Sequence, residues 1–135
     1  MRSRTDALVK PKSPLIEYIH DLALLLNLGH WQIKLSTKTA PDDSVATVLV
    51  IAGQQVAEIR VQSGFMDLPP EDIRSALLHE LIHVHLWPLG EVVEHAGAAL
   101  GSNAASILEA AHGLANERAT DALSLAIAPF FPLPA

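Results

Sequence analysis

Two histidines, His79 and His83, lie one helical turn apart in an apolar segment, and a glutamate, Glu80, directly follows the first. The segment, residues 79–90, reads HELIHVHLWPLG. Residues four apart share a face of a helix, so His79 and His83 could present both imidazoles to one zinc ion. Glu80 is rotated by about 100° from His79 and flanks the ion, where its carboxylate could accept a proton from water. The alternative is a polar cluster satisfied by hydrogen bonds alone, because burying such groups without partners is costly.

A third ligand is needed, since zinc sites use at least three protein side chains. The chain has no cysteine, so this ligand must be histidine, aspartate or glutamate. Residues 116–121 read NERATD and place Glu117 and Asp121 on one face of a helix. One carboxylate could bind the metal while the other accepts a hydrogen bond from a ligating histidine, and we favour Glu117 as the ligand. A solvated helix face is the alternative, but the apolar neighbours of this pair predict that much of the helix is buried.

The first motif requires a helix to carry it. Pro69 and Pro70, followed by acidic residues, predict a helix start, and apolar residues recur at helical spacing through the motif. Pro88 and Gly90 predict that this helix ends near Trp87, because proline cannot continue the hydrogen-bond ladder.

The second motif is predicted to lie on a separate, final helix. Ser102 or Asn103 can cap its start, and Pro129 predicts that it ends before that residue. Residues 91–100, between the two helices, are predicted to form a short helix or a loop, because glycines lie at positions 97 and 101. The apolar tail, residues 129–135, is expected to pack on the body or to lie in the cleft and cover the site.

A small sheet is predicted in the first half of the chain. Ser13 and Pro14 predict the start of an N-terminal helix. Three segments with alternating or β-branched residues follow, residues 31–35, 45–52 and 55–61, and they predict the strands of an antiparallel or mixed sheet. Helices grouped on such a sheet make an α+β fold.

The composition limits the class of protein. With 135 residues, 50% apolar and 18% charged, the chain predicts one globular domain over residues 1–135, in which residues 1–12 and 129–135 could be flexible tails. The net charge of -6 and the lack of a basic face argue against nucleic acid as a partner. Neither a secretory signal nor an apolar run of about 18 residues is visible, which predicts a cytoplasmic protein without a membrane span.

HELIH and the downstream NERATD together resemble the paired motifs of the gluzincins, the thermolysin-like branch of the zincin metallopeptidases. The small size and the order of sheet and motif helices are similar to the minigluzincins in particular, over residues 45–127. The resemblance implies a zinc endopeptidase with one zinc ion per chain and a peptide or protein substrate. Glu80 would be its general base, and its zinc ligands would be His79, His83 and Glu117.

The resemblance also implies supporting roles. Asp121 would orient His79, and Asn116 would support His83. One strand would be an exposed edge that pairs with an extended substrate, and it would contain Ala57, Glu58 and Ile59. Larger gluzincins take an oxyanion-stabilising side chain from a second domain, for which this chain offers as stand-ins Tyr18, His95, His112 and Arg118.

Other ligand schemes and another class of function stay open at this point. A SprT-like protease would use a histidine further along the chain, and His95 is a rough match. Asp121 could be the ligand, as in the aspzincins, whereas Leu89 occupies the position where a metzincin needs a histidine. A zinc-stabilised binding or regulatory domain without turnover is the alternative to an enzyme.

Overall fold

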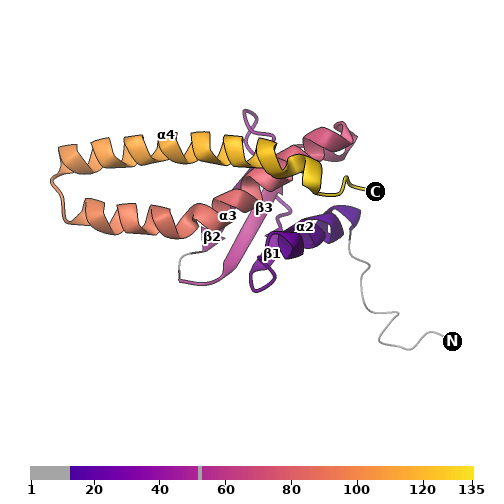
Figure 1. The fold of residues 1–135 in the computed structure, drawn as a ribbon, viewed down its shortest axis with the longest axis horizontal. Helices are drawn as coiled ribbons and strands as arrows, with labels where there is room; N and C mark the ends of the chain where they lie inside the picture. Colours follow the sequence, from indigo (N-terminus) through magenta and orange to yellow (C-terminus); the bar gives the residue numbers. More distant parts are fainter. Residues whose placement is uncertain (1–12, 52) are drawn as a thin grey trace.

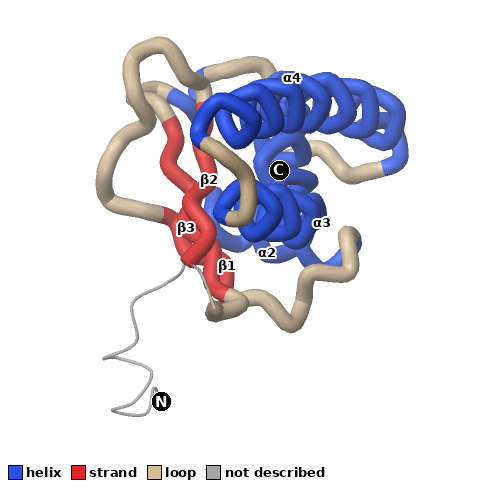
Figure 2. The backbone as a smooth tube through the Cα atoms, turned by 90° about the vertical axis from the view of Figure 1, so that its left-hand side faces the viewer, coloured by secondary structure: helices blue, strands red, loops and turns tan. Residues whose placement is uncertain are grey.

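The computed structural model describes residues 13–51 and 53–135, so the predicted tail at residues 1–12 lies outside the described part. Three helices, two short 3-10 turns and a three-stranded mixed sheet make up that part, which confirms the predicted α+β class. Figure 1 shows α3 and α4 extending as a long antiparallel pair beyond the sheet. Figure 2 shows that the helices lie to one side of the sheet.

The first described helix, α2 (Pro14–Leu25), begins where the sequence predicts. The Ser13 hydroxyl accepts a hydrogen bond from the Ile16 backbone N–H at 3.2 Å, and Pro14 occupies the first turn, where a missing N–H costs nothing. One face of α2 is buried against the sheet and α3, through Leu15, Tyr18, Ile19, Leu22 and Ala23.

The sheet has the order β1-β3-β2, with β1 (Gln32–Leu35) parallel to β3 (Val56–Val61) and β2 (Ala46–Ile51) antiparallel to it. The prediction that Ala57 to Ile59 form an exposed edge is therefore wrong, because β3 pairs on both sides. Ala57 and Ile59 are fully buried, as the side chains of a central strand should be. The strand positions follow from local patterns, but the order in the sheet depends on the crossover from β1, which local patterns do not encode.

The helix that carries the first motif, α3 (Pro70–Ala98), is one continuous helix of 29 residues. The predicted end near Trp87 is wrong, because α3 continues through Pro88. Pro88 itself is exposed, and α4 packs along α3 and supports its second half. The predicted short helix or loop at residues 91–100 is thus mostly part of α3.

The last long helix, α4 (Ser102–Ile127), runs antiparallel to α3. Its predicted burial is wrong, since Thr120 and Ser124 are its only buried residues. We call residues 85–119 the arm; within it Gly97 is the only buried residue. The apolar side chains of α4 are exposed because the arm extends past the sheet and no other element of the described chain covers it.

The C-terminal tail packs on the body. A 3-10 turn at Ala128–Phe130 follows α4, and Phe131 contacts the hydrophobic core. Tyr18 donates a hydrogen bond from its hydroxyl to the Pro132 carbonyl at 2.7 Å, and Arg74 donates one to the Phe131 carbonyl at 3.0 Å. These contacts agree with the expectation that residues 129–135 pack on the body, and not with a flexible tail. Among the described residues, no helix has the length and apolar character to cross a membrane.

Candidate metal centre

The core holds α3 in a fixed rotation about its axis. Leu77, Leu81 and Val84 are buried at 0%, 0% and 1% exposure and face the sheet and α2. The adjacent face of the helix therefore turns toward α4 and carries His79 and His83, which keep 21% and 14% of their side-chain surface exposed. This orientation places two imidazole side chains in the lining of an open cleft.

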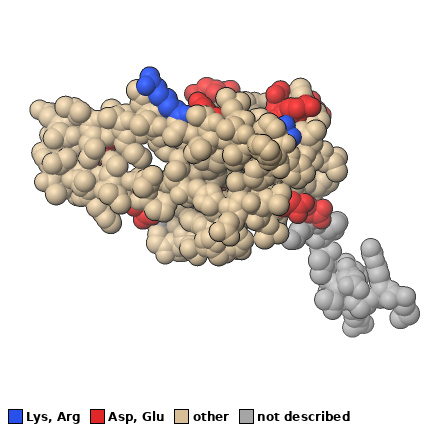
Figure 3. Space-filling view, viewed as in Figure 1, with Lys and Arg blue, Asp and Glu red and all other residues tan. Residues whose placement is uncertain are grey.

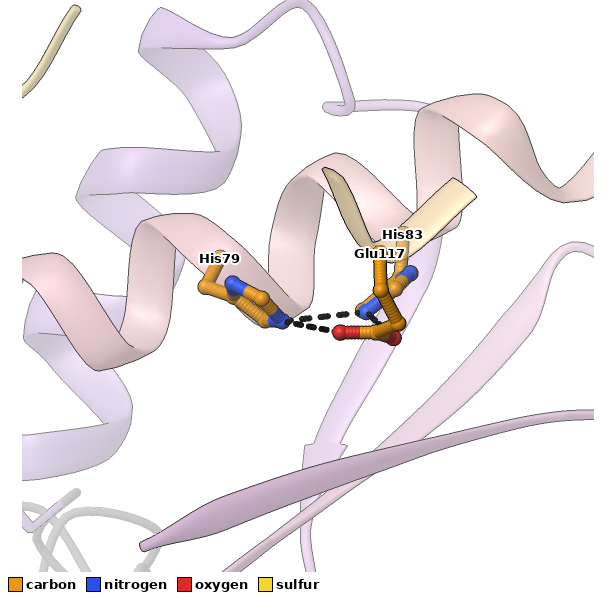
Figure 4. Close-up of side chains that lie close together, drawn as sticks. All are labelled: His79, His83 and Glu117. Atoms are coloured by element: carbon orange, nitrogen blue, oxygen red, sulfur yellow. Dashed lines mark hydrogen bonds and ion pairs between the residues drawn. The ribbon is translucent and has the colours of Figure 1, made fainter. Parts of the chain in front are cut away.

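Three donor side chains converge between α3 and α4. The His83 Nε2 atom lies 2.9 Å from Glu117 Oε1, His79 Nε2 lies 3.4 Å from Glu117 Oε2, and the two Nε2 atoms are 3.1 Å apart. Figure 4 shows the imidazoles and the carboxylate pointing toward one another from the two helices. His79, His83 and Glu117 form a group that could hold a metal ion, as the sequence predicts.

The three donors lie close enough together to share one ion. One atom from each residue can be chosen so that all three lie within 4.8 Å of one another, whereas ligand atoms of a tetrahedral zinc site are roughly 3.3 Å apart. The two histidines approach different oxygens of Glu117, at 2.9 Å and 3.4 Å, so this carboxylate would have to turn slightly for one oxygen to bind an ion that both histidines hold. The Glu117 side chain is 57% exposed, so an ion could enter from solvent and keep one coordination position open to water. Two imidazoles and a carboxylate suit a divalent transition metal, and donor types alone do not select one.

Asp121 determines which nitrogen of His79 is free. Its Oδ1 atom lies 3.0 Å from His79 Nδ1, so this carboxylate can accept the Nδ1 proton. A neutral imidazole with its proton on Nδ1 has its lone pair on Nε2, which is the nitrogen that faces Glu117 and His83. The contact expected of Asp121 is present, and it holds His79 in the tautomer that a metal requires.

Glu80 is a buried carboxyl group beside this centre. Its exposed fraction is 8%, and it lines the cleft together with both histidines. Burial, and to a lesser degree the negative charge of Glu117, raise the pKa of Glu80 to about 7. A carboxyl group with this pKa can both accept and release a proton near neutrality.

His83 is held in its neutral form. Burial lowers the pKa of His83 below its usual value, Glu117 opposes the lowering, and His79 adds to it. Neutral imidazole is the form that binds a metal ion, so the protein does not have to remove a proton from His83 near pH 7.

The cleft has a volume of about 950 Å³ and lies between α3, α4 and the first half of β2. Its walls contain all four residues of the predicted centre, His79, Glu80, His83 and Glu117. Sequence reasoning missed that β2 borders the cleft. Residues 44–48 line it, and β2 is an edge strand of the described sheet. In the structure, the exposed side chains of Leu49 and Ile51 are typical of an edge strand. The sequence alone does not show this exposure, because both residues are apolar and fit a buried strand equally well.

Two predicted contributions to the centre are wrong. Asn116 lines the cleft, but its observed hydrogen bond uses its backbone carbonyl, which accepts from the Thr120 hydroxyl at 2.7 Å, and no hydrogen bond joins it to His83. His95 is exposed on α3, twelve residues beyond His83, or about 18 Å along a continuous helix. It therefore cannot share an ion with His83.

The proposed stand-ins for an oxyanion-stabilising residue lie in different places. Tyr18 contacts the C-terminal tail at Pro132 and does not line the cleft. Arg118 and His95 are exposed and lie outside the cleft lining. Of the four, His112 alone lines the cleft. None of residues 129–135 lines it, so the idea that the tail covers the site is wrong.

Comparisons of the chain with models of protein families, with curated proteins and with solved structures find no significant match.

Proposed function

We propose that this protein is a zinc-dependent peptidase of the gluzincin type, with a peptide or protein as its substrate. The convergence of His79, His83 and Glu117 on one point, beside a buried glutamate in an open cleft, is the observation that carries the proposal. The resemblance of the two sequence motifs to the minigluzincins agrees with it. Two imidazoles and one carboxylate favour zinc over ions such as calcium and magnesium, which prefer oxygen ligands.

The residues around the centre divide the chemical work. A zinc ion held there supplies a Lewis acid, which polarises a carbonyl and lowers the pKa of water. Glu80 accepts the proton of the attacking water and passes it to the leaving amine, for which a pKa of about 7 is well suited. Asp121 keeps the Nε2 lone pair of His79 available, through its contact with Nδ1.

An edge strand beside the cleft supports a peptide as the substrate class. Residues 44–48 line the cleft, and β2 pairs with β3 on one side only in the described sheet. An extended peptide can add to such an edge through backbone hydrogen bonds, which hold its main chain without requiring one sequence. Substrate pairing is thus assigned to β2 in place of the strand that contains Ala57.

The test is turnover by the Glu80→Gln variant. We expect this variant to keep its zinc and to cleave peptides at least about 100-fold more slowly, which is the usual contribution of a general base. Glu91→Gln is the matched control, because Glu91 is an exposed residue of α3 outside the cleft lining. Cleavage by Glu80→Gln at the rate of the control would rule out this mechanism.

A second candidate is a metal-stabilised binding domain without turnover. The possible metal ligands connect two helices, since His79 and His83 come from α3 and Glu117 comes from α4. The packing of α4 is weak, because Thr120 and Ser124 are its only buried residues. A metal ion would then stabilise the folded state by joining α4 to the body. Zinc-loaded protein that is strongly stabilised by the metal and cleaves no peptide would favour this candidate.

A further inference from the structure

The cleft extends well beyond the metal centre along α3. Past His83 its lining continues through Leu86, Trp87 and Gly90, and His112 of α4 closes it on the other side. We call Leu86, Trp87, Gly90 and His112 the far subsite. Gly90 follows His83 by seven residues, so the far subsite lies about 10 Å from the centre along the helix axis.

Gly90 is the feature of the far subsite that packing does not explain. Glycine in the interior of a helix costs about 1 kcal/mol relative to alanine. A Cβ atom at Gly90 would lie 3.5 Å from Cε1 of His112, which is an ordinary contact, so an alanine would fit. Gly90 therefore adds no side chain to the wall of the cleft, and a side chain larger than alanine there would narrow the cleft beside His112.

The walls of this part of the cleft are mostly apolar, and the core holds one of them. Trp87 packs against the hydrophobic core on one side and lines the cleft on the other. Leu86 is half-buried beside it, and the half-buried ring of His112 faces Gly90 across the gap between the helices. A space bounded by a leucine, a tryptophan and an imidazole ring suits a large apolar or aromatic side chain.

We infer that the far subsite selects substrates with a large apolar or aromatic side chain about three residues from the scissile bond. This inference rests on the proposed function. An extended peptide advances about 3.3 Å per residue, so a side chain roughly 10 Å from the centre belongs to the third residue on one side of the bond. Gly90 is then a specificity-determining residue.

The position of His112 separates it from the chemistry. It lies level with Gly90, about two helical turns beyond His83, so its ring is too far from the centre to stabilise an oxyanion there. His112 would instead contact the large side chain of the substrate. Loss of the His112 ring should therefore reduce the preference for peptides with that side chain, and should change little the cleavage rate of peptides that lack it.

The experiment measures selectivity on a diverse peptide library, read by mass spectrometry. Zinc-loaded wild type, Gly90→Leu and Gly113→Leu are compared, with Glu80→Gln as the blank. Gly113→Leu is the matched control, because Gly113 is also inside a helix of the arm, is exposed and lies outside the cleft lining. Gly90→Ala is the milder variant, since its Cβ makes only an ordinary contact. Binding of the same library to zinc-loaded Glu80→Gln, with and without Gly90→Leu, gives a readout that does not need turnover.

We expect wild type and Gly113→Leu to prefer a large apolar side chain at one position about three residues from the cut. Gly90→Leu should reduce this preference about tenfold, and Gly90→Ala should reduce it less. Cuts that depend on Glu80 but show no such preference, or a preference unchanged by Gly90→Leu, would overturn the far subsite and leave the peptidase intact. Zinc-loaded protein that neither cuts nor binds any peptide would overturn both.

Discussion

His79 uses both nitrogens of its ring, and each has a partner on α4. Nδ1 lies 3.0 Å from Asp121, and Nε2 lies 3.4 Å from Glu117. Two carboxylates four residues apart on one helix can therefore act differently on the same imidazole: Asp121 can accept a hydrogen bond from Nδ1–H, and Glu117 could bind the same metal ion as Nε2. The arrangement fixes both the tautomer and the orientation of the ring before a metal arrives.

Removal of Asp121 should therefore weaken the metal site without removing a ligand. We expect Asp121→Ala to lower zinc affinity by about 10- to 100-fold, measured by competition with a chromophoric chelator. Glu109→Ala is the control, because Glu109 is an exposed carboxylate of α4 outside the centre. An affinity equal to that of the control would show that Asp121 does not orient His79.

Glu80 should give the metal-free protein a pH-dependent stability. Its pKa is raised from 4.5 to about 7 by burial and by Glu117, so the folded state binds this proton more tightly than the unfolded chain does. The resulting stabilisation is complete below about pH 4.5 and is lost as the pH rises through about 7. Glu80→Gln has no such proton, and its stability should lack this decline.

Urea unfolding of the metal-free proteins at about pH 5 and about pH 8 measures this effect. The stability of Glu80→Gln relative to wild type should rise between these pH values by at most about 3 kcal/mol. His83 acts in the opposite direction, because its lowered pKa makes its contribution grow as the pH rises toward 6.5, but both proteins contain it. Parallel stability profiles for the two proteins would contradict the raised pKa of Glu80.

The site residues could be predicted from the sequence where local geometry determines them. The spacing of four residues places His79 with His83, and Glu117 with Asp121, because a helix has the same geometry in every protein. The role of Asn116 was predicted wrongly, because whether its side chain reaches His83 depends on how α4 is rotated against α3. Gly90 was predicted to help end the helix near Trp87, and neither residue was predicted to line the cleft, because local sequence does not show which face of a helix lines a cleft.

At the scale of elements, α3 has two halves with different support. The first half is held by the core, through Leu77, Leu81 and Val84 among others, whereas the arm buries only Gly97. Pro88, Gly90 and Gly97 lie inside the second half of α3, and each is unfavourable in a helix. Local stability should therefore fall sharply from the centre toward the tip of the arm.

Hydrogen exchange followed by mass spectrometry should show this gradient. We expect amides of residues 89–112 to exchange at least about 100-fold faster than those of residues 77–84, because local opening of the arm costs less than global unfolding. Equal protection of the two ranges would mean that something beyond the described chain covers the arm, such as a second copy.

The positions of the helices and strands along the chain were predicted better than their arrangement in the fold. The three strands, the start of α2 and the end of α4 follow from caps, prolines and alternating patterns, which act over a few residues. The continuation of α3 through Pro88 was not predicted, because pairing with α4 overrides the local cost of proline. The central place of β3 was not predicted either, since strand order is decided by packing across the whole sheet.

At the scale of the whole molecule, the metal centre lies where the arm joins the body. Glu117 lies where the arm meets the body, and His79 and His83 lie in the part of α3 that the core supports. Figure 3 shows acidic side chains at several places on the body, whereas the outer part of the arm shows few charged side chains. A cation at this junction would bind the two helices to each other and would reduce the repulsion between Glu117 and Glu80.

The metal centre can be tested by titrating the metal-free protein with zinc and recording X-ray absorption at the zinc edge. We expect one ion per chain, bound by two imidazole nitrogens and a carboxylate oxygen at about 2.0–2.2 Å. His83→Ala should lose this shell of ligands and His95→Ala should keep it, because His95 lies about 18 Å further along α3. A zinc ion surrounded only by water, or a shell that depends on His95, would rule out the centre formed by His79, His83 and Glu117.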